Sequence, residues 1–150
     1  MNLQNDFMEI MNYAHMWNWA PDMDVLQRIY DEFPESYSVL TPFAYTYLEE
    51  LIRSLTSQYG REYSDANGNP LKRKVGYALL SLAIQENQNN SKLVALLNDM
   101  KDYFSISTSE DTGDNRNSTV HGYMHPRYWS KDSFEKLIHD IALLSPYAGF

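Results

Sequence analysis

The chain contains no cysteine among its 150 residues, which excludes a disulfide framework and thiolate chemistry. Glycine and proline are scarce, at six residues each, and this argues against a turn-rich all-β fold. No apolar run approaches the length that crosses a membrane, and the first residues lack the basic start and apolar run of a signal peptide. We therefore expect a cytoplasmic protein with no membrane-spanning segment.

Positive charge is also in short supply, since 12 Lys and Arg face 20 Asp and Glu, for a net charge of −8. A generic nucleic-acid binder needs Lys and Arg clustered on one face. Here the bases concentrate in Lys72, Arg73 and Lys74 and in the stretch from Arg116 to Arg127. If RNA binds, we expect it to contact these two segments and to avoid the acidic N-terminal third. For most of the acids, a solvated surface is the simpler interpretation.

Apolar residues recur at helical spacing along nearly the whole chain, so we expect a single all-α domain over residues 1–150. The predicted helices span residues 7–17, 25–33, 42–55, 75–82, 93–104 and 132–144. Ala20-Pro21 should end the first helix, and Thr41 should cap the third, with Pro42 at its first position. Between residues 60 and 70, Asn67-Gly68 favours a small hairpin or a loop insertion.

The segment from Asn115 to Pro126, which reads N-R-N-S-T-V-H-G-Y-M-H-P, carries the residues best suited to chemistry. Asp114 is the expected N-cap of a helix over this segment. Arg116 is a permanent cation whose planar fork matches a phosphate, and His121 can take and give a proton near neutral pH. Together they indicate work on a phosphodiester.

His121 lies five positions after Arg116, which places the two residues about 140° apart around an ideal helix. They share one site only if both side chains lean toward one edge or if a second subunit contributes. Each also has a plain structural interpretation: an ion pair with an acid for Arg116, and a helix-end histidine bonded to backbone for His121.

The string R-N-S-T-V-H-G-Y, with Asn directly after Arg116 and Gly-Tyr directly after His121, resembles the motif of the HEPN superfamily of all-helical domains. Catalytic members carry R-x4-6-H. The resemblance implies a HEPN-like helical bundle that acts as a metal-independent ribonuclease and leaves a cyclic phosphate. It implies proton transfer by His121, charge stabilisation by Arg116 and an orienting role for Asn117. It further implies a two-fold homodimer that pairs both motifs, and no cofactor or metal.

The longer pattern of Arg116, His121 and Tyr123 is similar to that of HEPN toxins paired with nucleotidyltransferase antitoxins, in which the tyrosine is adenylylated. The resemblance therefore implies a modification site at Tyr123 and a place in a toxin–antitoxin or phage-defence system. The alternative is a non-catalytic HEPN-like module that binds a nucleotide or stabilises a dimer. A helical bundle of unrelated function is the third interpretation.

Several other residues have open interpretations. Glu49 and Glu50 either line a site beside the motif or form a solvated helix flank. Tyr128 and Trp129 either stack on a base or pack the loop against the bundle. His121 and His125 lack the further ligands of a zinc set, the string from Asp65 to Asn69 imitates a calcium loop but is expected to be a turn, and His139 is expected to be structural or exposed.

Overall fold

The computed structural model describes residues 2–62 and 64–150, and within them it confirms the all-α class, with no strand. Residue 63, inside the predicted hairpin, lies outside the described part. The α-helices are α1 (Leu3–Tyr13), α2 (Ala20–Glu32), α3 (Tyr37–Ser54), α4 (Gly76–Glu86), α5 (Ser91–Asp99), α6 (Arg116–Val120) and α7 (Lys131–Leu144). Four 3-10 turns join or follow them: η1 (Pro34–Ser36), η2 (Met100–Phe104), η3 (Pro126–Tyr128) and η4 (Ser145–Tyr147).

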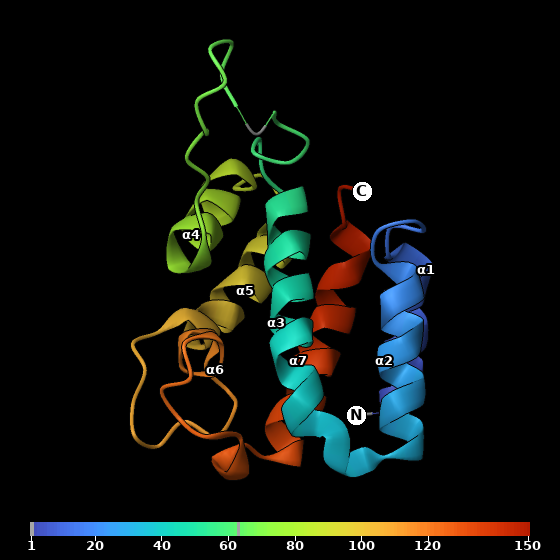
Figure 1. Cartoon of the computed structure of the whole chain (residues 1–150). Coiled ribbons are helices and arrows are strands. Elements are labelled where there is room, and N and C mark those ends of the chain that lie inside the picture. The colour runs from blue at the N-terminus through green and yellow to red at the C-terminus, as the bar shows by residue number, and fades with distance from the viewer. Residues whose placement is uncertain (1, 63) are drawn as a thin grey trace.

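The long helix α3 stands at the centre of the bundle (Figure 1). It packs against α7 on one side and against α4 and the short α6 on the other. Helix α1 packs along α7, and α2 lies beside α1. The motif helix therefore sits against the central helix, between the α4–α5 pair and the lower end of the bundle.

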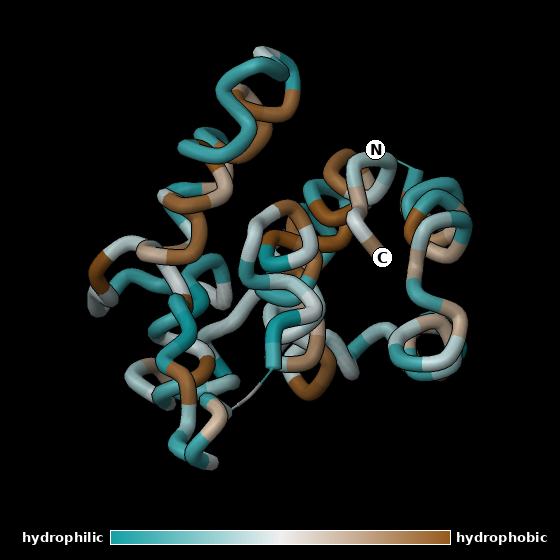
Figure 2. The backbone as a smooth tube through the Cα atoms, turned by 90° about the horizontal axis from the view of Figure 1, so that it is seen from above, coloured by the Kyte–Doolittle hydropathy of each residue, from teal (hydrophilic) through white to brown (hydrophobic). Residues whose placement is uncertain are grey.

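Hydrophobic and hydrophilic residues are interspersed along the helices (Figure 2). The core forms where the apolar sides of these helices pack against one another. Helix α3 is buried on most sides, as its central position requires. The largest side chains with almost no exposure are Tyr45, Tyr47, Phe7, Phe134, Ile10, Met23, Leu48, Leu51, Ile52, Leu79, Leu80 and Leu97.

The first two helices meet at a different place from the one predicted. Helix α1 ends at Tyr13, and α2 begins at Ala20, so Pro21 opens the second helix and does not end the first. The physical reason is that proline has no N–H to offer and is tolerated in the first turn, where that group has no partner within the helix.

Helix α3 begins at Tyr37, five residues before its predicted start at Pro42. Thr41 does not cap the helix, because its hydroxyl donates to the Tyr37 carbonyl at 2.7 Å within the first turns. Pro42 is accommodated inside the helix, at the loss of one backbone hydrogen bond. Burial of Leu40 and Ala44 against the core offsets this cost.

The segment between α3 and α4 projects from the body (Figure 1). In its described residues the predicted hairpin is reduced to one isolated antiparallel bridge, between Ser64 and Pro70. The Asp65 carboxylate accepts hydrogen bonds from the backbone N–H groups of Asn67 at 2.8 Å and Asn69 at 2.9 Å. The string that imitates a calcium loop is therefore a turn closed by its own aspartate.

We expect Leu137→Ala to lower the free energy of unfolding by about 2–5 kcal/mol, because it leaves a cavity where α7 meets the core. Leu143→Ala is the matched control on the same helix, since Leu143 is 44% exposed and Leu137 is fully buried. Urea titrations followed by circular dichroism measure both. Equal losses in the two variants would contradict the observed packing of α7.

Candidate active site on the central helix

The motif helix α6 is capped by Asn115 and not by Asp114. The Asn115 side-chain oxygen accepts the backbone N–H of Ser118 at 3.0 Å, and its amide donates to the Ser105 carbonyl at 3.1 Å. Asp114 accepts the N–H of Thr112 at 2.8 Å and stays in the preceding loop. The Asn115 side chain accepts the cap hydrogen bond and also donates to Ser105 at the end of η2. A carboxylate can only accept, which explains why Asn115 and not Asp114 caps α6.

Two glycines frame α6. Gly122 has φ +65°, and the Tyr123 N–H donates to the Ser118 carbonyl at 2.9 Å, as in a Schellman C-terminus, so α6 stops just before this glycine. Upstream, Gly113 has φ +90°, and a Cβ there would meet the Cβ of Trp129 at 3.0 Å. Gly113 is required by both its φ and this contact, whereas at Gly122 the positive φ alone favours glycine.

A buried tyrosine of α3 holds the loop that leads into α6. The Tyr45 hydroxyl donates to the Gly113 carbonyl at 2.9 Å. Burial raises the pKa of Tyr45 well above its ordinary value, and the nearby Asp114 carboxylate adds to the effect. Tyr45 therefore remains a hydrogen-bond donor at any physiological pH.

Arg116 points from α6 toward α3, where its guanidinium pairs with the Glu49 carboxylate at 2.6 Å. Both side chains are largely covered, with 17% and 10% of their surfaces exposed. The other Glu49 oxygen accepts the backbone N–H of Gly76 at 3.2 Å and lies 3.7 Å from the Arg53 guanidinium. Glu49 thus joins α6, α3 and the start of α4.

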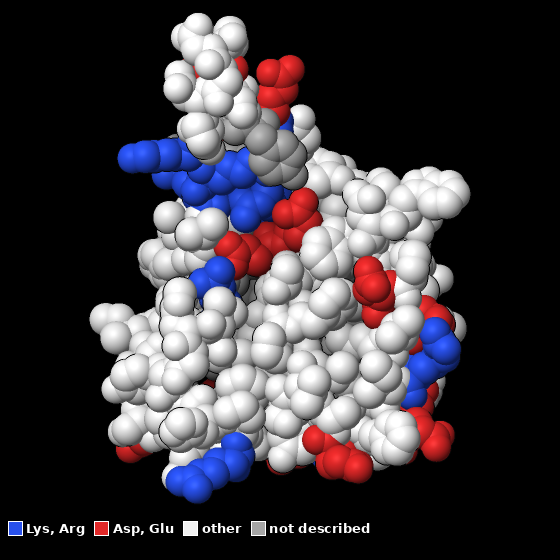
Figure 3. Space-filling model, viewed as in Figure 1, with Lys and Arg blue, Asp and Glu red and all other residues white. Residues whose placement is uncertain are grey.

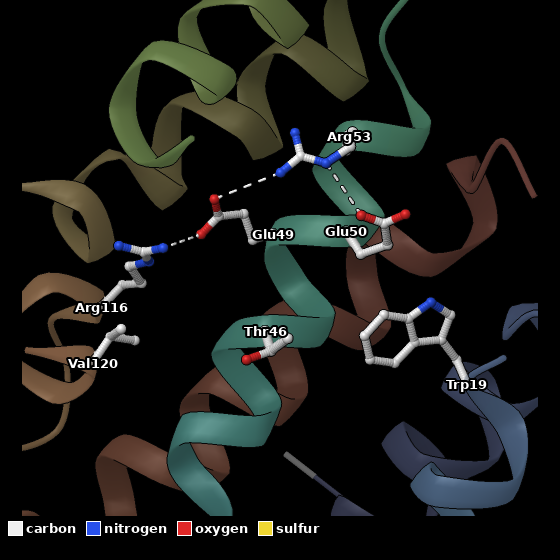
Figure 4. A pocket seen from close by; sticks show the side chains of 7 residues that line it. All are labelled: Trp19, Thr46, Glu49, Glu50, Arg53, Arg116 and Val120. Atoms are coloured by element: carbon white, nitrogen blue, oxygen red, sulfur yellow. Dashed lines mark hydrogen bonds and ion pairs between the residues drawn. The ribbon is translucent and has the colours of Figure 1, made fainter. Parts of the chain in front are cut away.

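The charge network continues along α3. The Nε of Arg53 donates to Glu50 at 3.2 Å, and its NH1 donates to the Lys74 carbonyl at 2.8 Å. Figure 4 shows this chain of groups, from Arg116 through Glu49 and Arg53 to Glu50. The charges of two arginines and two glutamates therefore compensate one another in this network.

These residues line a cavity of about 260 Å³ that runs across α3, from α6 to the start of α2 (Figure 4). Its lining residues are Trp19, Thr46, Glu49, Glu50, Arg53, Arg116 and Val120. We call this cavity the α3 pocket. Val120 and Arg116 form its wall on the α6 side, and the Trp19 indole stands at the opposite end.

His121 and Asn117 do not line the α3 pocket. His121 is the C-cap of α6 and is exposed, and within residues 2–62 and 64–150 its ring makes no hydrogen bond or ion pair. Asn117 accepts from the Arg116 guanidinium at 3.3 Å and donates to the Ser105 carbonyl at 3.2 Å, so it steadies Arg116. One chain alone does not bring Arg116 and His121 into a common cavity.

The candidate RNA contacts divide into two places. Lys72 and Arg73 line a small cavity of about 80 Å³ together with Arg61, and Lys74 adjoins the α3 pocket through the Arg53 bond to its carbonyl. Figure 3 shows Lys and Arg gathered on this face at the base of the projecting segment, directly above acidic side chains. Arg127 lies apart and stacks on the Tyr128 ring at 4.6 Å.

Three of the open interpretations have structural answers. Glu49 lines the site and is no solvated flank. Trp129 is buried, while Tyr128 remains 46% exposed beside Arg127. The His139 ring lies 3.0 Å from the Asp6 carboxylate, so it joins α7 to α1.

Sequence reasoning missed Trp19 and Arg53 as lining residues. For Arg53, a signal existed in its spacing of four and three residues from Glu49 and Glu50, which places all three along one side of α3. Trp19 gave no such signal, because it comes from the turn before α2 and reaches the pocket only in the folded chain.

Comparison of the chain with models of protein families, with curated proteins and with solved structures finds no match. Across the described residues, no group of three or more His, Cys, Asp or Glu side chains is placed to hold a metal ion. Nor is any helix in that part of the chain both long and apolar enough to cross a bilayer.

We expect Glu49→Gln to lower the free energy of unfolding by about 1–3 kcal/mol, because it leaves two largely covered arginines without their shared counter-charge. Asp24→Asn is the control, since it breaks an exposed ion pair with Arg28 and should cost less than about 1 kcal/mol. Thermal and urea unfolding measure both. A Glu49 variant as stable as the Asp24 variant would mean that the network adds nothing to the fold.

Proposed function

We propose that the protein is a metal-independent endoribonuclease of the HEPN type. The observation that carries the proposal is the division of labour on α6. Arg116 is held in a cavity by Glu49 and Asn117, and His121 is left accessible at the other end of the same helix. A fixed cation and a free proton carrier are what cleavage of a phosphodiester by its own 2′-hydroxyl needs.

In this chemistry the 2′-hydroxyl loses its proton to a base and attacks the adjacent phosphorus. The 5′-oxygen of the next nucleotide leaves with a proton from an acid, and a cyclic phosphate remains. His121 carries the proton. Arg116 supplies the charge, since a guanidinium has several N–H donors and Glu49 and Asn117 engage only part of them.

A homodimer supplies what one chain lacks. The two motif side chains diverge from a short helix, so a second copy is needed to bring a histidine to each arginine, or base and acid together. Three exposed apolar or aromatic side chains lie in the same stretch of chain as His121 and suit a two-fold contact: Val120, Tyr123 and Tyr128. We place the dimer axis near this patch.

RNA would reach the motif from the basic cluster of Lys72, Arg73 and Lys74, which adjoins the α3 pocket. Arg127 would contact the strand on the far side of α6. Because the net charge is −8, binding should be confined to this face, and the enzyme should be selective or dependent on a partner.

The same resemblance supports a toxin of a toxin–antitoxin or phage-defence system. The Tyr123 side chain is 59% exposed and lies two residues beyond His121. A nucleotidyltransferase antitoxin could therefore reach its hydroxyl, and an adenylyl group added there would stand beside the catalytic histidine.

One observation favours a second candidate, a non-catalytic nucleotide-binding or dimeric interaction module. Arg116 is paired with Glu49 inside a single chain, which lowers the positive charge that it can present to a phosphate. The distinction between the two functions is whether phosphodiester cleavage depends on both Arg116 and His121.

We expect His121→Ala and Arg116→Ala each to reduce RNA cleavage by about 10²- to 10⁴-fold. Cleavage by the parent chain should persist in a chelator and yield cyclic-phosphate ends. Gel and mass analysis of a structured and an unstructured RNA measures rates and ends. His125→Ala is the matched control, an exposed histidine four residues further along, and should cleave like the parent.

A requirement for a divalent ion, or parent-like rates in both motif variants, would contradict the ribonuclease proposal. Inactive parent protein with intact nucleotide binding would favour the second candidate. Circular dichroism of each variant separates loss of activity from loss of fold.

We also expect a solution mass of twice the 17.5 kDa of one chain. Val120→Asp should yield monomers, because it puts a charge into the expected apolar contact, where Val120 is 45% exposed. Val25→Asp, at a 41% exposed site on α2, is the control and should remain dimeric. Light scattering after gel filtration reports the masses. A monomeric parent that still cleaves RNA would rule out the shared cleft.

A further inference from the structure

The α3 pocket extends beyond anything that the motif uses. Phosphodiester chemistry accounts for Arg116, but not for Trp19 or Glu50 at the other end of the cavity. The formal charges of the four ionised side chains that line the pocket, two glutamates and two arginines, sum to zero. Glu50 would repel a phosphate placed at this end of the pocket, so this end fits an uncharged group rich in hydrogen-bond donors.

Glu50 is the acceptor that such a group would meet. Its side chain is 30% exposed, and one of its oxygens is fixed by the Nε of Arg53 at 3.2 Å. In the described part of the chain the other oxygen accepts no hydrogen bond, and the fixed oxygen keeps a free lone pair. The carboxylate is therefore oriented by Arg53 and can still accept from two adjacent donors.

Trp19 offers a flat apolar wall beside this carboxylate (Figure 4). The indole is itself held in place by Phe43 and Tyr47, whose ring centroids lie 5.9 Å and 5.3 Å from it. A rigid aromatic face next to an oriented acceptor is how proteins read an unpaired nucleobase: they stack on it and bond to its Watson–Crick edge.

We propose that the α3 pocket binds a guanine base. Guanine presents two neighbouring donors on its Watson–Crick edge, the ring N–H and the exocyclic amino group, which match the two oxygens of Glu50. Adenine and cytosine present one amino group next to an acceptor, and uracil presents one N–H between two carbonyls. Each would place an acceptor against the carboxylate.

This inference rests on the proposed function in one respect, because it names the nucleotide that the ribonuclease selects next to the scissile phosphate. With a guanine between Trp19 and Glu50, its phosphate is expected on the Arg116 side of the pocket. The base-binding step itself needs neither cleavage nor His121, so it can be measured alone.

The test uses the full chain carrying His121→Ala, and it follows tryptophan fluorescence as the 3′-monophosphates of guanosine, inosine, adenosine, cytidine and uridine are added. We expect guanosine to bind about 10- to 100-fold more tightly than adenosine, cytidine or uridine. Inosine, which lacks the exocyclic amino group, should bind about tenfold less tightly than guanosine. Equal affinity for guanosine and inosine, or for all five nucleotides, would overturn the proposal.

Glu50→Gln should remove the preference for guanosine, since an amide offers one acceptor to the two donors. Glu32→Gln is the matched control, an exposed glutamate near the end of α2 that does not line the pocket. Trp19→Phe should abolish the fluorescence response, whereas Trp17→Phe should keep it, because Trp17 is 81% exposed outside the α3 pocket. A guanosine preference that survives Glu50→Gln would overturn the assignment.

Cleavage mapping with the parent chain distinguishes failure of this inference from failure of the ribonuclease proposal. Selective guanosine binding without any cleavage would leave the pocket assignment standing and would remove the ribonuclease. His121-dependent cleavage that shows no preference for guanosine, together with no selective nucleotide binding, would support the ribonuclease proposal and overturn the pocket assignment. If Glu50→Gln fails to fold, the comparison of guanosine with inosine still decides the question.

Discussion

The arrangement of the site depends on one largely buried carboxylate. Glu49 accepts from Arg116 of the motif helix and from the backbone N–H at the start of α4, and it stands beside Arg53 on its own helix. A charge in this position is stable only when it is paired, and its partners are fixed in turn. Two segments far from Glu49 in the sequence, α6 and the start of α4, are thereby held to one point on α3.

This constraint shapes the chemistry that is available. Pairing with Glu49 orients Arg116 and lowers its net charge, so it suits a transition-state contact better than tight binding of phosphate in the ground state. The excess positive charge lies instead at the base of the projecting segment, which includes Lys72 and Lys74. The charge proposed to bind RNA is thus separate from the charge proposed to act in cleavage, and this fits a selective or partner-dependent enzyme on an otherwise acidic protein.

Helix prediction from the sequence succeeded where apolar periodicity was strong and failed where proline or a cap decided the boundary. The helix over residues 132–144 is α7 almost residue for residue, because its stripe of apolar side chains faces one core. Pro42 misled the prediction for α3. Local preference favours proline at a helix start, but burial of the preceding turn outweighed that preference.

By itself, the sequence determined the all-α class, the N-cap of α6 to within one residue, and the presence of Arg116 and His121 in one short motif. These features depend on contacts between neighbours in the chain. Only the tertiary structure decided that Arg116 faces Glu49, that His121 faces away, and that Trp19 closes the same pocket. Glu49 and Trp19 lie 67 and 97 residues from Arg116 in the sequence, and no local rule specifies which faces meet where α6 and the turn before α2 pack on α3.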